Sequence, residues 1–163
     1  MRTRNEIVER AFTHLGHQEE RENDSLLIRA WLRRCGVTAP APWCAAFASW
    51  CIEDSATGRP VALAGAVALG RLFSVTLEPQ PGDLMWFRTG DWTGHVGIVV
   101  AVRDFEVLCI EGNSRNMVRL VRRRRSDVNF SRTRAERWEN SLEGDPLHWR
   151  DAPLVVVEKE GTR

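Results

Sequence analysis

The amino-acid sequence predicts an α+β domain in which N-terminal helices pack on a mainly antiparallel sheet of five to six strands. Apolar residues recur at helical spacing through the first part of the chain, up to about residue 73. After the turn-forming residues 79–82, apolar residues alternate or run continuously, and short polar turns separate these runs. Such short turns are typical of an antiparallel meander. The length of 163 residues predicts a single domain, 1–163.

Four helices are expected in the first half of the chain. The second can begin at Asp24 or Ser25, because either side chain can cap the free amides, and it ends before Gly36. Residues 38–42 include two prolines and cannot be helical, so Cys44 opens the third helix. The predicted helices span residues 5–15, 24 or 25–35, 44–53 and about 62–73.

The candidate strands follow these helices. They span residues 83–87, 95–102, 106–111, 117–122 and 154–157. The stretch 126–150 has mixed charge and no clean period, so it predicts no regular element.

The composition excludes several classes of protein. No nucleic-acid motif occurs and no aromatic residues are interleaved with the basic run 122–125, so we expect no nucleic-acid partner. No apolar run approaches the roughly 20 residues of a transmembrane helix. The opening residues lack the apolar run of a signal peptide, which predicts a protein made in the cytoplasm.

The four cysteines, at positions 35, 44, 51 and 109, are predicted to be free thiols. The chain is larger than the small secreted proteins that depend on disulfides, and it shows no secretion signal. The cysteine spacing does not match a zinc ribbon or finger. We therefore expect no metal and no cofactor.

Cys44 and His95 are the candidate nucleophile and base. A thiol in the first turn of a helix lies beside unpaired amides and the positive end of the helix dipole, which favours the thiolate. His95 begins a strand directly after Gly94, in a stretch that otherwise reads as core. The other histidines lie on the N-terminal helix, at its end, or in the irregular tail.

A third group can come from the next strand. Alternation places Cys109, Glu111 and Asn113 on one face of that strand. If that face looks toward the Cys44 helix, Glu111 or Asn113 can bind the far nitrogen of His95 and fix its tautomer.

Four motifs resemble the CHAP amidase family, within the wider NlpC-like papain superfamily. They are Pro-Trp-Cys-Ala-Ala-Phe (42–47), Pro-Gly-Asp-Leu (81–84), Gly-His-Val-Gly-Ile-Val (94–99) and Ile-Glu-Gly-Asn (110–113). Their order and rough spacing match, and together they cover about residues 40–122.

The resemblance implies a papain-like fold and cleavage of amide bonds in bacterial peptidoglycan through a thioester. It assigns the nucleophile to Cys44, the base to His95 and the orienting role to Glu111, with Asn113 beside it. Residues 38–42 offer no polar side chain of the kind that serves some relatives as oxyanion donor, so we expect the Cys44 backbone amide in that role.

Further expectations concern place and partners. Activity on peptidoglycan would require the protein to reach the periplasm or cell wall after export or lysis, with an immunity protein or a delivery partner as a possible companion. An alternative is a papain-like hydrolase, deamidase or acyltransferase that acts on a protein. Another is a non-catalytic partner-binding or metal-binding module, with Cys44, His95 and Cys109 as zinc ligands.

Two groups of residues have open interpretations. Trp43 and Trp92 flank the candidate site in sequence and could contact substrate, or they could belong to the core. Arg122 to Arg125 could contact an anionic polymer, or they could form a solvated strand end.

Overall fold

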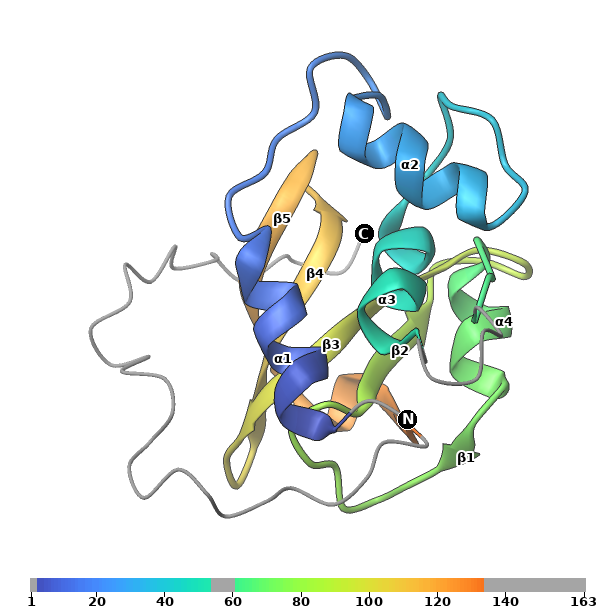
Figure 1. Cartoon of the computed structure of the whole chain (residues 1–163). Helices are drawn as coiled ribbons and strands as arrows, with labels where there is room; N and C mark the ends of the chain where they lie inside the picture. The colour runs from blue at the N-terminus through green and yellow to red at the C-terminus, as the bar shows by residue number, and fades with distance from the viewer. Residues whose placement is uncertain (1–2, 54–60, 134–163) are drawn as a thin grey trace.

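The computed structural model describes residues 3–53 and 61–133. It is an α+β structure in which helices of the N-terminal half cover one face of a six-stranded antiparallel sheet, as the sequence predicts (Figure 1). Among the described residues, no helix is long and apolar enough to cross a membrane. The predicted strand 154–157 lies outside the described residues.

Side-chain caps or a proline-containing segment determine where the first three helices begin. Thr3 and Glu6 form a capping box at the first helix. Ser25, and not Asp24, caps the second, since its hydroxyl accepts a hydrogen bond from the Ile28 amide. Cys44 opens the third helix, as expected. The four helices are α1 (Arg4–Thr13), α2 (Leu26–Arg34), α3 (Cys44–Ile52) and α4 (Ala66–Arg71).

The sheet contains the predicted meander and two strands that sequence patterns did not reveal. The meander consists of β2 (Leu84–Arg88), β3 (Gly94–Val102), β4 (Glu106–Ser114) and β5 (Met117–Arg124). The unpredicted strands are β1 (Ser74–Val75) and β6 (Asn129–Arg132), and the strand order is β1-β6-β2-β3-β4-β5.

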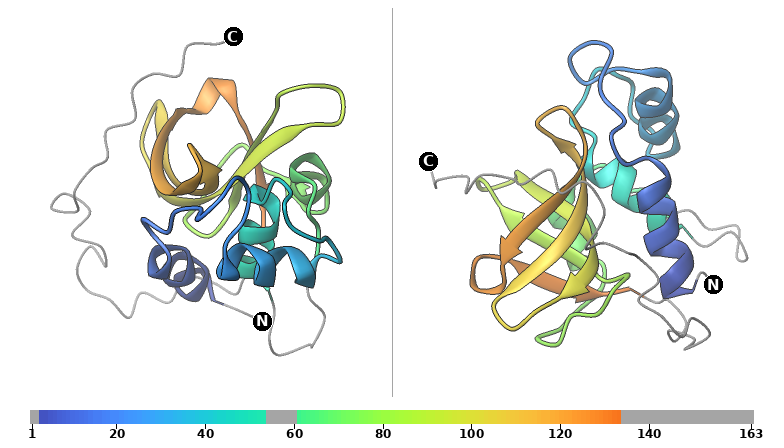
Figure 2. Two further views of the ribbon diagram at one scale, coloured as in Figure 1. Left: turned by 90° about the horizontal axis from the view of Figure 1, so that it is seen from above. Right: turned by 90° about the vertical axis from the view of Figure 1, so that its left-hand side faces the viewer.

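The short link between β5 and β6 requires the sheet to curve. In a flat sheet of this order, β5 and β6 would lie four strand spacings apart, about 19 Å. Only the 3₁₀ turn η1 (Arg125–Asp127) and Val128 join the two strands. The five steps from Arg124 to Asn129 would span at most about 18 Å if fully extended, and the 3₁₀ turn shortens this reach. The sheet is therefore strongly curled, as Figure 2 shows.

Each face of the curled sheet contributes to a separate core. The helices pack on the face that carries Ile98 and Ile110, and eight of the nine residues of α3 are buried there. The other face encloses a smaller apolar cluster of Met85, Val99, Val107, Cys109 and Phe130. The larger core fixes α3 against β3 and β4, which positions the candidate site.

Candidate active site

Cys44 lies at an end of α3 where backbone amides are available. It is the first residue of the helix, and no side chain among the described residues caps this N-terminus. The first helical hydrogen bond runs from the Phe47 amide to the Trp43 carbonyl. Cys44 keeps 6% of its surface exposed. The thiol is thus nearly enclosed, close to amides that favour a negative charge.

His95 connects Cys44 to Glu111. Its Nε2 atom lies 2.8 Å from Glu111 Oε2. Cys44 is close enough to His95 for its side chain to raise the pKa of the ring. Because Nε2 is occupied by the carboxylate, Nδ1 is the ring nitrogen left for the sulfur. The order sulfur, imidazole and carboxylate is the arrangement that nucleophile, base and orienting group require.

The surroundings of His95 favour its charged form. Burial alone would lower its pKa, but the hydrogen bonds to Cys44 and Glu111, and their negative charges, raise the pKa of His95 to about 10. The ring is therefore an imidazolium at neutral pH. Such a cation beside Cys44 stabilises the thiolate.

Glu111 is fully buried and is held by two partners. Arg123 donates from Nε to Oε1 at 2.9 Å and from its terminal nitrogen to Oε2 at 2.8 Å, while His95 occupies Oε2 as well. Burial would raise the pKa of Glu111, but the bonds to Arg123 and His95 outweigh it and lower this pKa. The carboxylate stays ionised in a buried position because two cations compensate its charge.

The expectation that Cys109, Glu111 and Asn113 share one face of β4 holds only in part. Cys109 and Glu111 share a face of β4, as alternation predicts, but α3 packs on the opposite face. A Cβ atom on Gly112 would lie 2.8 Å from Phe47 Cβ, which shows that Gly112 faces the helix. Cys44 therefore meets the side chain of His95 from the N-terminal end of α3, and not across the flank of the helix.

Asn113 does not join this group. Its φ of 55° ends the regular alternation of β4, and its side-chain amide donates to Asn23 Oδ1 at 3.2 Å. Among the described residues, no hydrogen bond links it to His95. Asn113 instead ties β4 to the loop between α1 and α2.

The two candidate tryptophans have opposite environments. Trp43 is 0% exposed, stacks on Trp31 with ring centroids 5.6 Å apart, and donates from Nε1 to Glu19 at 2.7 Å. The expected substrate contact does not hold for Trp43, because its ring is covered by the helical layer. Trp92 lies in the turn before β3 and is 94% exposed, so its ring is accessible.

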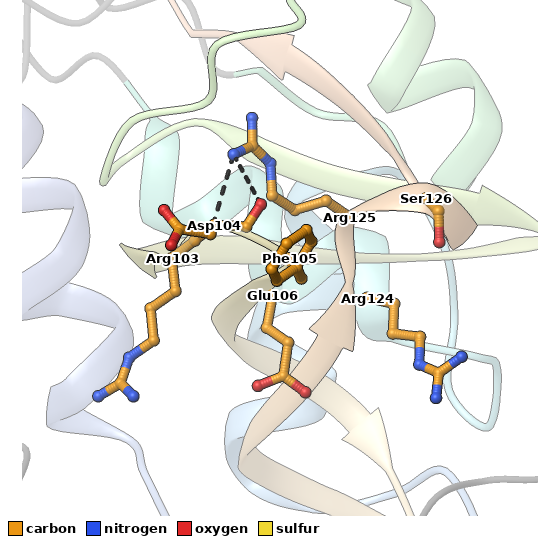
Figure 3. A pocket seen from close by; sticks show the side chains of 7 residues that line it. All are labelled: Arg103, Asp104, Phe105, Glu106, Arg124, Arg125 and Ser126. Atoms are coloured by element: carbon orange, nitrogen blue, oxygen red, sulfur yellow. Dashed lines mark hydrogen bonds between the residues drawn. The ribbon is translucent and has the colours of Figure 1, made fainter.

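The arginine run divides by strand alternation. Arg123 points to Glu111, whereas the side chain of Arg122 is 52% exposed. Arg125 donates to backbone carbonyls, including those of Arg103 and Asp104, and helps to line the open hollow in Figure 3. This hollow lies at the far end of β3, about 20 Å along the strand from His95. It does not belong to the candidate site.

The remaining cysteines do not take part. All four cysteines are free thiols, as expected. Burial, followed by the charge of Glu111, raises the pKa of Cys109 well above its usual value, which keeps that thiol protonated. Within residues 3–53 and 61–133, no three His, Cys, Asp or Glu side chains form a group that could hold a metal ion. The convergence of Cys44, His95 and Cys109 on zinc is therefore not observed.

Sequence reasoning missed the role of Arg123. Strand alternation could have revealed it, because Arg123 lies an even number of residues after Arg119. In the β4–β5 hairpin, Glu111 pairs with Arg119 and Val107 pairs with Arg123. Arg123 therefore shares the face of Glu111. Reading residues 122–125 as one basic run hid this alternation.

Comparison with known protein families finds a match over the segment that contains these residues. The model of the CHAP domain matches residues 36–113, a segment that contains Cys44, His95 and Glu111. No curated protein and no solved structure matches the chain. Residues 36–113 are therefore similar to the CHAP domain, which is typical of amidase-like and peptidase-like hydrolases.

Proposed function

We propose that this protein is a cysteine-dependent hydrolase that cleaves amide bonds of bacterial peptidoglycan. Cys44 acts as the nucleophile, His95 as the proton carrier and Glu111 as the orienting group. One observation carries the proposal: His95 interacts with the Cys44 side chain, which raises the pKa of the ring, and its Nε2 lies 2.8 Å from the buried carboxylate of Glu111.

The acylation step follows from the charge states of these groups. The Cys44 thiolate attacks the amide carbonyl carbon, and the carbonyl oxygen becomes an oxyanion. The His95 imidazolium then gives its proton to the leaving nitrogen. The C–N bond breaks, the amine departs, and a thioester remains on Cys44.

Hydrolysis of the thioester restores the starting state. Neutral His95 now accepts a proton from water, whose oxygen attacks the thioester carbonyl. The C–S bond breaks, the acid leaves, and Cys44 with His95 returns to the thiolate and imidazolium pair. Throughout the cycle, Glu111 keeps the ring in one tautomer and orientation.

We assign the oxyanion donor to the Cys44 backbone amide. This amide lies at the N-terminus of α3, before the first helical hydrogen bond, and no described side chain caps it. A preorganised donor of this kind typically contributes about 10²-fold to the rate or more. Residues 38–42 contain no Gln, Asn or acidic side chain, which supports the assignment.

The match to the CHAP domain and the exposed ring of Trp92 support a cell-wall substrate. CHAP hydrolases commonly act on peptidoglycan. Trp92 lies in the turn that leads into the strand of His95, and its exposed indole can stack on a sugar ring or a stem peptide. In this proposal the protein acts in the periplasm or at the cell wall.

Digestion of purified sacculi tests the proposal. The wild type should release soluble muropeptides, and mass spectrometry of the new amine and carboxyl ends identifies the bond that is cut. Cys44→Ala should release none. Cys35→Ser is the matched control, since this thiol lies at the C-terminal end of α2 and should be dispensable. Equal release by folded Cys44→Ala would refute the proposal. Cleavage of a protein substrate, with sacculi intact, would point to the alternative substrate class.

A further inference from the structure

We propose that Arg123 is a positioning residue of this site: its two parallel hydrogen bonds hold Glu111 ionised and correctly oriented, and through Glu111 they determine the state of His95. The inference deepens the proposed function, because it concerns the same catalytic groups. It makes a residue of the apparent surface run 122–125 part of the active-site network.

The geometry of the Glu111 carboxylate supports this role. Both of its oxygens are occupied, Oε1 by Arg123 Nε and Oε2 by the Arg123 terminal nitrogen together with His95 Nε2. A planar guanidinium that binds a carboxylate through two parallel bonds fixes its plane as well as its position. The oxygen that orients His95 is thus fixed from the opposite side by Arg123.

The charge balance gives Arg123 a second task. The Glu111 carboxylate is compensated by two positive groups, His95 and Arg123. Glu111 is 0% exposed, so water cannot compensate its charge. If Arg123 were replaced by a neutral residue, His95 alone would compensate Glu111, and burial would favour protonation of Glu111.

Packing supplies an independent link between Arg123 and His95. The Arg123 guanidinium lies over the Phe87 ring, 4.9 Å from its centroid. Phe87 pairs with His95 in the β2–β3 register, and their ring centroids are 5.7 Å apart. Arg123 therefore supports the imidazole through an aromatic ring as well as through Glu111.

Replacement of Arg123 should change the pH dependence of Cys44 alkylation, and not only the rate of alkylation. In Arg123→Met, Glu111 takes up a proton at higher pH than in the wild type. Once neutral, Glu111 no longer stabilises the imidazolium that lies beside Cys44. The acidic limb of Cys44 reactivity should move upward by about one pH unit or more, which means about tenfold slower reaction on that limb.

The test uses iodoacetamide alkylation of Cys44 between pH 4.5 and 9, with peptide mass spectrometry to separate Cys44 from the other three cysteines. Arg122→Met is the matched control, because its side chain is 52% exposed on the opposite face of β5. Arg123→Lys keeps the charge but not the two parallel bonds, so its acidic limb should lie between those of the wild type and Arg123→Met. If Arg123→Met does not fold, comparison of the alkylation profile of Arg123→Lys with that of the wild type tests the proposal.

A displaced acidic limb in the Arg123 variants, with an unchanged profile in Arg122→Met, supports the proposal. Two results overturn it: profiles that superimpose on the wild type, or an equal loss of reactivity at every pH, as a merely structural role would give. Muropeptide release is measured in parallel. If wild-type protein releases nothing from sacculi, the proposed substrate is wrong, while the alkylation profile still decides the role of Arg123.

Discussion

Gly97→Ala offers a sharp test of how the Glu111 carboxylate is held. Gly97 on β3 pairs with Glu111 on β4. A Cβ atom at this position would lie 2.7 Å from Glu111 Cγ and 3.0 Å from the carbonyl oxygen of Ile110. Neither neighbour can move freely, because Arg123 holds the carboxylate and the carbonyl belongs to the sheet backbone.

The expected effect follows from these distances. Ordinary van der Waals contact begins near 3.4 Å, so Glu111 Cγ must move by about 0.7 Å. Added to the 2.8 Å bond between His95 and Glu111, such a displacement gives about 3.5 Å, beyond ordinary hydrogen-bond lengths. A misplacement of about 1 Å can cost about 10²-fold in rate. Overpacking should also destabilise the fold by about 1–3 kcal/mol.

Muropeptide release and Cys44 alkylation are measured at 20 °C, and thermal unfolding is followed by circular dichroism. Gly65→Ala is the control, because a Cβ atom there would meet only Ala68 Cβ, at 3.5 Å. We expect Gly97→Ala to remain folded with a rate about 10²-fold lower. Wild-type activity and stability in Gly97→Ala would refute the reasoning.

Three further predictions concern stability and substrate contact. Arg4→Met should lower the unfolding free energy measured in urea by about 3 kcal/mol, since it removes the buried partner 2.7 Å from Asp83. The side chain of Arg29 is 50% exposed, so Arg29→Met should lower the unfolding free energy by at most about 1 kcal/mol. Equal losses in the two variants would contradict this prediction. Because the pKa of Glu111 is lower in the folded state, its ionised form stabilises the fold at neutral pH, and this stabilisation is lost as the pH falls from the ordinary carboxyl pKa through the lowered one. The urea midpoint of Glu111→Gln should therefore fall less steeply with acid than that of the wild type. Parallel curves for the two proteins would contradict this prediction. Trp92→Ala should leave the melting temperature unchanged, because the ring is 94% exposed, but should weaken co-sedimentation with sacculi; unaltered binding would remove Trp92 from the substrate site.

The sequence was informative wherever a pattern is local. Helical spacing and the proline-containing segment 38–42 placed α1 to α3 within a few residues of their observed bounds. Strand alternation did the same for β2 to β5. In contrast, β1 has two residues and β6 has four, too few to show a period. Their pairing depends on the curvature of the sheet, which no local pattern encodes.

The candidate site was partly predictable for the same reason. Cys44 and His95 stand at recognisable starts of a helix and a strand, and Glu111 follows from alternation along β4. Alternation left open which face of β4 lies toward α3, and it could not show that the end of a helix can reach residues that its flank does not cover. The burial of Trp43 depends on Trp31 and on Glu19, 24 residues earlier, so sequence left that choice open.

The central claim is that a charged imidazole at His95 stands between the Cys44 sulfur and the Glu111 carboxylate. Titration of the His95 ring by ¹⁵N NMR measures this directly, with the resonance assigned through His95→Gln. We expect the ring to remain an imidazolium at pH 8 and to lose its proton near the pKa of about 10, and Cys44→Ala to lower that pKa. A ring that loses its proton near pH 6.5 in both proteins would contradict the account.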